Sequence, residues 1–388
     1  MPLRRLLILT LGCFVIGTEL FIIGGILPDI ADSLKISVSL AGQLVTVFAC
    51  AYAVGAPFLT TMLWKLSRRS ILFYAMIAFA ISNFATALAP NFSSLLVIRI
   101  VSALSASLFI PNAASMVAEL SETQRRGRNL GIVMSGLGVA TVLGVPLGIT
   151  INALLSWRWV FVFVAVLSLA QAFLILSLPK NGISPVCSLK TRFSSLKNPA
   201  VVKTLVVTVL VICAGFTTYT YIAIIVQKSS GMNNAVFAFC LSMYGLASIL
   251  GSWAGGWFSD RYGPQKALIL NMILLVLVFA LLSPASSQAI PAILVMFLWG
   301  IVGSAFTPIQ QHRLLQVAGA NGSAALALNS SAIYLGQMFA GCLGGIVLAW
   351  SSASIIPIVS SCIDLAVLVF VIIIGQKASR AKFYKLSA

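Results

Sequence analysis

Hydrophobic runs alternate with short polar connections along the whole chain. An α-helix needs about 20 mostly apolar residues to cross the ~30 Å hydrocarbon core of a bilayer. Runs of this kind occupy Leu6–Leu27, Leu40–Leu63, Ile71–Ala89, Leu95–Leu120, Leu130–Leu155, Trp159–Leu178, Val201–Val226, Ala235–Phe258, Ala267–Leu282, Ile290–Gln310, Ala324–Trp350 and Ile355–Ile374. The short alternating segments that build a membrane β-barrel are absent from the sequence. The pattern therefore predicts an all-α membrane protein with about 12 transmembrane helices.

Composition supports a membrane protein and excludes several other classes. Apolar residues make up 60% of the 388 positions and charged residues 8%, and the mean hydropathy is +1.08. Water-soluble domains carry about 25% charged residues. The formal charge of +17 comes from short basic clusters, without the long basic tract or aromatic surface of a nucleic-acid-binding protein. The seven cysteines follow no CxxC or Cys/His spacing, so neither a disulfide framework nor a metal site is expected.

Basic residues are distributed unequally between the two sides of the predicted membrane protein. Only Lys35, Arg158 and Lys228 fall on one side, and Arg99 lies within a span. The other 20 of the 24 Lys and Arg residues fall in connections and chain ends on the opposite side. Membrane proteins keep their more basic short loops in the cytoplasm. We therefore expect both termini to be cytoplasmic.

The longest polar connection divides the predicted spans into two equal groups. This division gives an N-terminal six-helix bundle over residues 1–178, a cytoplasmic linker over 179–200 and a C-terminal six-helix bundle over 201–388. Gly55 and Gly251, which are 196 positions apart, each precede a basic turn at the matching place in their bundle. Two parallel repeats related by an axis along the membrane normal imply a central binding site and alternating access.

Several motifs resemble those of the major facilitator superfamily, and within it those of the twelve-span drug/proton antiporter group. The loop Gly255–Gly263 is similar to the loop signature of the superfamily, and Arg99 resembles its span-four arginine. The antiporter motif of span five is resembled by Gly136, Gly144, Pro146 and Gly148. Two further segments resemble those of the drug/proton antiporters, Trp157–Phe161 and Gly17–Ala31. Sugar, arabinose and purine exporters are the most similar subgroup.

The sequence departs from the family pattern at three places. Trp64 stands where the first loop motif normally has an aspartate, at the position that matches Asp260. Ser102 and Ala103 follow Arg99 in place of the usual glutamine and glycine. In span five, Val145 separates Gly144 from Pro146, where the family more commonly has an adjacent Gly-Pro pair, which weakens the inference of antiport slightly. The first departure removes any gating interaction of that aspartate from the first half of the chain.

The resemblance implies a secondary active transporter of major-facilitator fold that exports a small organic solute by proton antiport. It further implies a monomer in the lipid bilayer of the bacterial cytoplasmic membrane, with the proton as coupling ion, no other cofactor and no enzymatic activity. The residues that would act in gating are Asp260, Arg261 and Lys266 in the second cytoplasmic turn, and Gly144, Pro146 and Gly148 in span five. The aspartate can accept hydrogen bonds from the free N–H groups at the start of a neighbouring helix, and the arginine can form an ion pair across the closed cytoplasmic interface. The glycines permit close approach between helices.

Only Glu19, Arg99 and Asp364 place formal charge well inside a predicted span. Such groups are costly in lipid and normally face a partner or a water-filled cavity. Glu19 lies roughly 20 Å from the cytoplasmic start of its span, at 1.5 Å per residue. Arg99 lies roughly 6 Å below the outer face, or ~24 Å from the cytoplasmic face of an ~30 Å core. The two depths agree, so contact between Glu19 and Arg99 is expected.

Two interpretations of Glu19 remain open from the sequence. As a proton carrier, it would balance burial, which disfavours the ionised carboxylate, against a nearby cation, which favours it. As a structural residue, it would form a permanent pair with Arg99 that ties two helices together. Asp364 lies in a span that is usually peripheral in the superfamily, and we expect it to be a hydrogen-bonded packing residue.

The remaining cavity residues are expected to be polar but uncharged. The candidates for substrate binding are Gln43, Tyr52, Asn112, Tyr219, Tyr221, Gln310, Asn329, Tyr334 and Gln337. Amides and phenols offer fixed donors and acceptors, which would suit a small molecule that carries hydroxyl groups or a nucleobase. Residues of these types also form hydrogen bonds between membrane helices, and this alternative applies to each candidate.

Three further function classes can be weighed from the sequence. Nutrient uptake by symport or uniport uses the same architecture as export and stays open. A membrane-embedded enzyme or sensor is disfavoured because the chain has no ATP-binding loop, no HExxH cluster and no appended soluble domain. A channel is disfavoured because no ring of charge or filter-like repeat is present. Export of a small neutral or weakly cationic organic molecule is the leading hypothesis.

Overall fold

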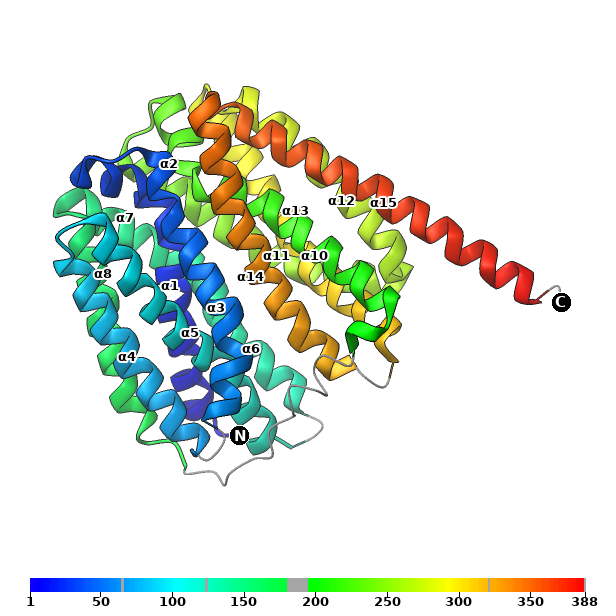
Figure 1. Ribbon diagram of the computed structural model, residues 1–388, viewed down its shortest axis with the longest axis horizontal. Helices are drawn as coiled ribbons and strands as arrows, with labels where there is room; N and C mark the ends of the chain where they lie inside the picture. Colours follow the sequence, from blue (N-terminus) through cyan, green and yellow to red (C-terminus); the bar gives the residue numbers. More distant parts are fainter. Residues whose placement is uncertain (64–65, 123–124, 180–194, 320–321, 387–388) are drawn as a thin grey trace.

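The structure is a computed structural model in which residues 1–63, 66–122, 125–179, 195–319 and 322–386 are described (Figure 1). Its elements in chain order are α1 (Leu3–Leu34), α2 (Val38–Ala41), α3 (Gln43–Met62), α4 (Arg68–Leu88), α5 (Phe92–Leu120), α6 (Arg126–Val139), η2 (Ala140–Gly144), α7 (Val145–Leu154), α8 (Trp157–Ile175), η3 (Ser195–Lys197), α10 (Pro199–Thr220), η4 (Ala223–Lys228), α11 (Asn234–Tyr262), α12 (Pro264–Ala285), α13 (Ala289–Ala318), α14 (Gly322–Trp350) and α15 (Ile355–Leu386).

Twelve spans in the described part of the chain are long and apolar enough to cross a membrane. Helices α2 and α3 share one of these spans, and α6, η2 and α7 together form another. Large apolar side chains face outward, for example Leu88 at 81% exposure and Trp350 at 88%. Exposed apolar surface of this kind suits contact with lipid rather than water. The predicted all-α membrane fold is confirmed.

Helix boundaries coincide with capping residues in the short connections. Asn91 and Ser94 form a reciprocal capping box that starts α5. Asn233 accepts from the backbone of Val236 and starts α11. Such caps satisfy the free N–H groups at a helix start. Gly263, at φ +83°, separates α11 from α12 in a backbone conformation that favours glycine.

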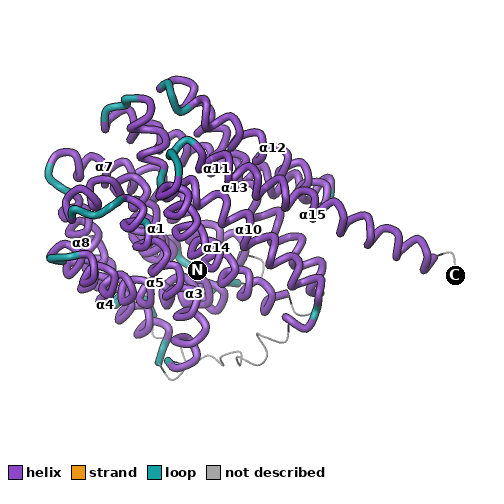
Figure 2. The backbone as a smooth tube through the Cα atoms, turned by 45° about the horizontal axis from the view of Figure 1, so that its top comes forward, coloured by secondary structure: helices purple, strands orange, loops and turns teal. Residues whose placement is uncertain are grey.

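The helices form two groups that lie side by side (Figures 1 and 2). Helices α1 to α8 pack chiefly on one another, and so do α10 to α15. Most of the predicted linker at 179–200 lies outside the described residues, because 180–194 are not described. We call the end of the molecule at which α1 begins the terminal end, and the end at which α1 finishes the distal end.

The two groups meet along α3 against α14 and along α11 against η2 and α7. Near the distal end, the Ser39 hydroxyl donates to the carbonyl of Gly345 at 2.7 Å. The Tyr219 hydroxyl donates to the carbonyl of Phe21 at 3.1 Å. These hydrogen bonds join the groups in the distal half of the molecule.

Two further contacts between the groups lie closer to mid-depth. The rings of Tyr52 on α3 and Tyr334 on α14 stack with centroids 3.5 Å apart. Gly245 on α11 lies so close to η2 that an added Cβ would be 2.8 Å from the carbonyl carbon of Thr141. The named contacts between the groups therefore extend from mid-depth to the distal end.

Candidate functional site

Three side chains from α1 and α5 form a buried charged cluster. Glu19 on α1 forms an ion pair with Arg99 on α5, and the Arg99 and Glu19 side chains are 2% and 0% exposed. Ser102, one turn along α5 from Arg99, donates to Glu19 Oε1 at 2.8 Å and lies 3.0 Å from Oε2. The contact deduced from the two depths is present. Ser102 was identified from the sequence only as a departure from the family pattern, and its role was missed.

The guanidinium of Arg99 is also in contact with an aromatic ring. Its central carbon lies 4.5 Å from the ring centroid of Phe48 on α3. A cation over a ring face gains about 2 kcal/mol or more when desolvated. The Nε atom of Arg99 is buried without a hydrogen-bond partner among the described residues. Arg99 is therefore fixed by a carboxylate and a ring, and one donor is left unused.

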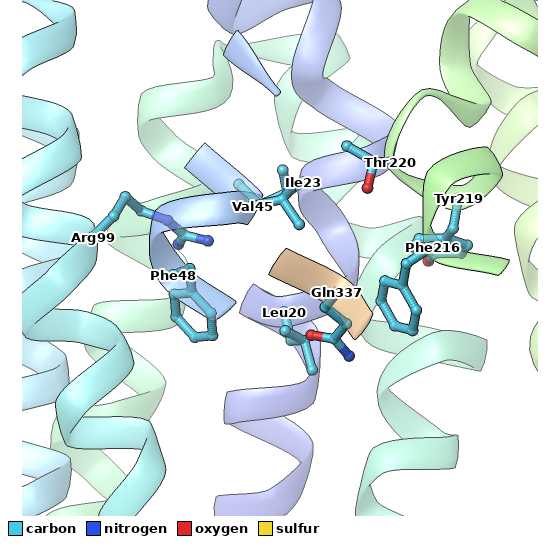
Figure 3. Close-up of a pocket in the computed structure, with 10 residues that line it drawn as sticks. Leu20, Ile23, Val45, Phe48, Arg99, Phe216, Tyr219, Thr220 and Gln337 are labelled. Carbon is cyan, nitrogen blue, oxygen red and sulfur yellow. The ribbon is translucent and has the colours of Figure 1, made fainter. Parts of the chain in front are cut away.

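A narrow pocket lies beside this cluster, between the two groups of helices (Figure 3). Helices α1, α3 and α5 line it from one side, and α10 and α14 line it from the other, through Leu20, Ile23, Gly24, Val45, Phe48, Arg99, Phe216, Tyr219, Thr220 and Gln337. In Figure 3, Arg99 and Phe48 lie across the pocket from Phe216 and Tyr219. Its empty space is about 330 Å³ when the open solvent at its mouth is counted. An occupant of this pocket would contact both groups of helices and the charged cluster.

The charged cluster is neutral only while Glu19 is ionised. Protonation of Glu19 would leave Arg99 as an unpaired cation, which costs several kcal/mol in a buried site. Water in the adjoining pocket can solvate that cation, whereas an apolar occupant cannot. A link between occupancy of the pocket and ionisation of Glu19 therefore stays a prediction.

Four of the substrate candidates lie at or near this pocket. Tyr219 and Gln337 line it directly. Tyr52 and Tyr334 stack on each other and join α3 to α14, and Tyr52 is one turn from Phe48 on α3. The two residues are 3% and 9% exposed, so the stack is a contact between the two groups rather than an open surface.

Two other candidates lie at the distal contact between the groups. Tyr221 is fully buried and its hydroxyl donates to the carbonyl of Gly341 on α14 at 3.1 Å. The side-chain oxygen of Gln43 lies 3.7 Å from the thiol of Cys342, also on α14. The hydrogen bond of Tyr221 lies within the second group, and its hydroxyl also lies against Gly42 of the first group. The contact of Gln43 with Cys342 joins the two groups, and neither candidate lines the pocket.

Gln310 and Asn329 form a separate polar cluster inside the second group. The Gln310 amide donates to the carbonyl of Thr204 at 2.7 Å and lies 3.1 Å from the hydroxyl of Thr208. That hydroxyl donates to Asn329 at 2.8 Å. The cluster ties α10, α13 and α14 together, as expected of interhelical hydrogen-bonding residues.

Asn112 lies near the terminal end of α5, away from the pocket. It accepts from the Arg68 guanidinium at 3.1 Å, and Arg68 also forms an ion pair with Glu119 at 2.5 Å. Asn112 therefore belongs to a contact between α4 and α5. Trp64, the departure in the first loop motif, lies outside the described residues.

The charged gating candidates lie at the terminal end of the second group. Asp260 is 82% exposed and its carboxylate lies 3.5 Å from the ring of His312. Arg261 lies over the ring of Trp257, 5.3 Å from the centroid. Lys266 is exposed. The contacts of Asp260 with His312 and of Arg261 with Trp257 are within the second group, and the gating role of these residues stays a prediction.

The glycine and proline motif of span five packs directly on α1. An added Cβ at Gly144 would lie 3.0 Å from two carbon atoms of Thr18, and one at Gly148 would lie 2.7 Å from Ile22. Pro146 stands in the first turn of α7, directly after the π-helical segment η2. The motif therefore combines close helix approach with a local change of helix type.

The prediction that Asp364 is hydrogen-bonded is wrong. The residue is fully buried on α15, and neither carboxyl oxygen has a hydrogen-bond partner among the described residues. The neighbouring Ser360 and Ser361 donate instead to backbone carbonyls of α10 and α12. Hydrophobic periodicity reveals that a residue is buried, but not whether donors surround it.

Comparison with known proteins identifies similar sequences and folds. The family model of the Major Facilitator Superfamily matches residues 9–324. The chain is 29% identical to the inner membrane transport protein YdhP of Escherichia coli K12 over 376 residues, which is 96% of each chain. It is 32% identical to a chloramphenicol resistance protein of Streptomyces lividans over 281 residues, 71% of each chain. The solved structure of the nucleoside transporter NupG has a similar fold, with a TM-score of 0.80, 15% identity and coverage of 97% of this chain and 100% of that one.

Proposed function

Because the chain belongs to the major facilitator superfamily and is a membrane transporter of small solutes, we propose that it exports an organic solute by proton antiport. The solute is a sugar, a nucleoside or purine, or a drug-like compound. Glu19 and Arg99 couple the proton, and the two groups of helices rock about the pocket between them in alternating access. The observation that carries the proposal is the buried Glu19–Arg99 pair, whose arginine lines this pocket.

Charge balance gives the pair a mechanism for antiport. In the empty, hydrated pocket, Glu19 takes up a proton and water solvates Arg99. When a solute enters and displaces that water, the protonated state becomes unfavourable because it leaves a buried unpaired cation. Glu19 then releases its proton and pairs with Arg99, so that solute and proton exclude each other.

Alternating access requires the contacts at the distal end to open. The terminal end, which carries the basic connections, is the cytoplasmic end in this proposal. The hydrogen bond between Ser39 and Gly345 and the stack of Tyr52 on Tyr334 support a form that is closed toward the outside. The close packing of Gly144 and Gly148 on α1 is the contact about which the first group adjusts.

Export rather than uptake is supported by one relative. The Streptomyces lividans protein is a chloramphenicol resistance protein by name, and a transporter that confers resistance moves its compound out of the cell. Uptake of a nutrient by proton symport is the second candidate, because the same cluster could bind a proton together with a solute.

The direction of coupled movement separates the two candidates. Purified protein is reconstituted into vesicles, and uptake of radiolabelled chloramphenicol, a pentose or a nucleoside is followed under an imposed pH gradient. Antiport predicts solute accumulation in vesicles that are acidic inside, and symport predicts accumulation in vesicles that are alkaline inside. Movement that is indifferent to the gradient would contradict proton coupling.

A matched pair of variants tests the role of Glu19. Glu19→Gln keeps the size of the side chain and removes its titration, so gradient-driven accumulation should fall to the level of empty vesicles. Glu122→Gln makes the same change at an acid that is 74% exposed and should leave accumulation unchanged. Full proton-driven transport by Glu19→Gln would contradict the assignment of Glu19 as the proton-coupling residue.

A further inference from the structure

A second pocket, lined mostly by aromatic rings, adjoins the central pocket. It lies between α1 and the helices α10, α11, α12 and α13, and its empty space is about 530 Å³ when the open solvent at its mouth is counted. The two pockets share Phe216 and Tyr219. The aromatic residues that line it are Phe21, Phe216, Tyr219, Tyr244, Phe279, Trp299 and Phe306. We call this the aromatic pocket.

The surface of the aromatic pocket is mainly apolar ring surface, with a smaller polar part. The ring centroid of Trp299 lies 5.1 Å from that of Tyr244 and 5.2 Å from that of Phe279. The hydroxyl of Tyr219 is already donated to the carbonyl of Phe21. No Asp, Glu, Lys or Arg is among the residues that line the pocket.

Gly215 in the wall of the pocket is not needed for helix packing. An added Cβ there would meet nothing within 4 Å, whereas one at Gly251 would collide with the α13 backbone. Glycine inside a helix costs about 1 kcal/mol relative to alanine. Gly215 therefore contributes open space in the middle of α10, and this space belongs to the aromatic pocket.

We propose that the aromatic pocket binds an uncharged, flat aromatic ring system of the transported solute, an inference that rests on the proposed transport function. Stacked or edge-to-face rings gain about 0.5–1.5 kcal/mol beyond the burial of their area. A permanent cation would gain contacts with the rings but find no acid to balance its charge, and most hydroxyl groups of a sugar would meet ring surface rather than donors or acceptors. A ring bound against Phe216 and Tyr219 also displaces water from the pocket that contains Arg99, which favours proton release from Glu19.

Two probes of equal carbon skeleton test the requirement for a flat ring. Binding of 2-naphthol and of decahydro-2-naphthol is measured by titration calorimetry with the full chain in lipid nanodiscs, and empty nanodiscs supply the background. 2-Naphthol should bind at least tenfold more tightly than its saturated counterpart. Equal affinity for the two probes would overturn the proposal.

Substitutions in the pocket wall locate the bound ring. Gly215→Leu fills the open space and should weaken 2-naphthol binding at least tenfold. The control is Gly131→Leu, at another helical glycine whose added Cβ would meet nothing within 4 Å, and it should bind as the parent does. Trp299→Leu should also weaken binding, whereas Trp253→Leu, at a tryptophan that is 73% exposed, should not.

Outcomes for the pocket and for the proposed function are separable. Unchanged 2-naphthol affinity in both Gly215→Leu and Trp299→Leu would overturn the pocket assignment, and melting temperatures show whether each variant is folded. Because the binding assay uses no gradient, 2-naphthol binding that depends on Gly215 upholds the aromatic pocket even if vesicles show no proton-coupled transport. That combination would contradict the proposed function alone.

Discussion

Replacement of Gly144 by alanine should destabilise the contact between α1 and η2. Its new Cβ would lie 3.0 Å from both Cβ and Cγ2 of Thr18 and closer still to Oγ1. Carbon atoms pack best at about 3.5–4.0 Å, so the methyl group overlaps three atoms of one buried side chain. Overpacking of this kind costs about 1–3 kcal/mol, against a gain of about 1 kcal/mol for alanine over glycine in a helix.

Thermal unfolding of the purified protein tests this magnitude against a control in the same span. A Cβ added at Gly131 on α6 would meet nothing within 4 Å, so Gly131→Ala should raise the free energy of unfolding by up to about 1 kcal/mol. Gly144→Ala should therefore be about 1–3 kcal/mol less stable than Gly131→Ala. Adding Thr18→Ala removes two of the overlapping atoms and should restore about 1 kcal/mol. If Gly144→Ala is as stable as Gly131→Ala, the packing account of this motif is refuted.

Two further predictions concern the distal contact and the buried carboxyl. A disulfide between Ser39→Cys and Gly345→Cys should form readily, because a Cβ at Gly345 would lie 3.3 Å from Ser39 Oγ. Oxidation of this pair should stop transport in vesicles, and reduction should restore it. Transport by the fully oxidised protein would show that this contact does not open. Asp364→Leu removes two buried oxygens without partners. It should raise the free energy of unfolding by about 1–3 kcal/mol and leave transport unchanged. Loss of coupled transport in a folded variant would show that Asp364 acts in coupling.

The sequence predicted the membrane fold and the charged cluster for definite physical reasons. Apolar runs of bilayer length set the number of spans. Buried charges in lipid need partners, so two residues at matching depths, Glu19 and Arg99, could be paired without a structure. Ser102 was overlooked because a serine carries no charge and commonly bonds to its own helix.

The lining of the pockets was beyond reach of the sequence. Seven of the nine polar candidates do not line the central pocket, because amides and phenols in membrane helices serve packing as readily as binding. The aromatic pocket was missed because its rings stand in helices that are apolar on every face. In a bilayer, Trp299 and Trp253 have the same sequence signature, although one lines a pocket and the other is 73% exposed.

Proton release on solute binding is the most direct test of the proposed coupling. Calorimetric titration of the parent protein with 2-naphthol in buffers of different ionisation enthalpy gives the number of protons released for each solute bound. Antiport through Glu19 predicts that close to one proton is released for each 2-naphthol bound, at a pH at which Glu19 is protonated in the empty protein. The Glu19→Gln variant should still bind 2-naphthol but release no proton. Binding without proton release at every pH in the parent, or equal release in Glu19→Gln, would contradict the account.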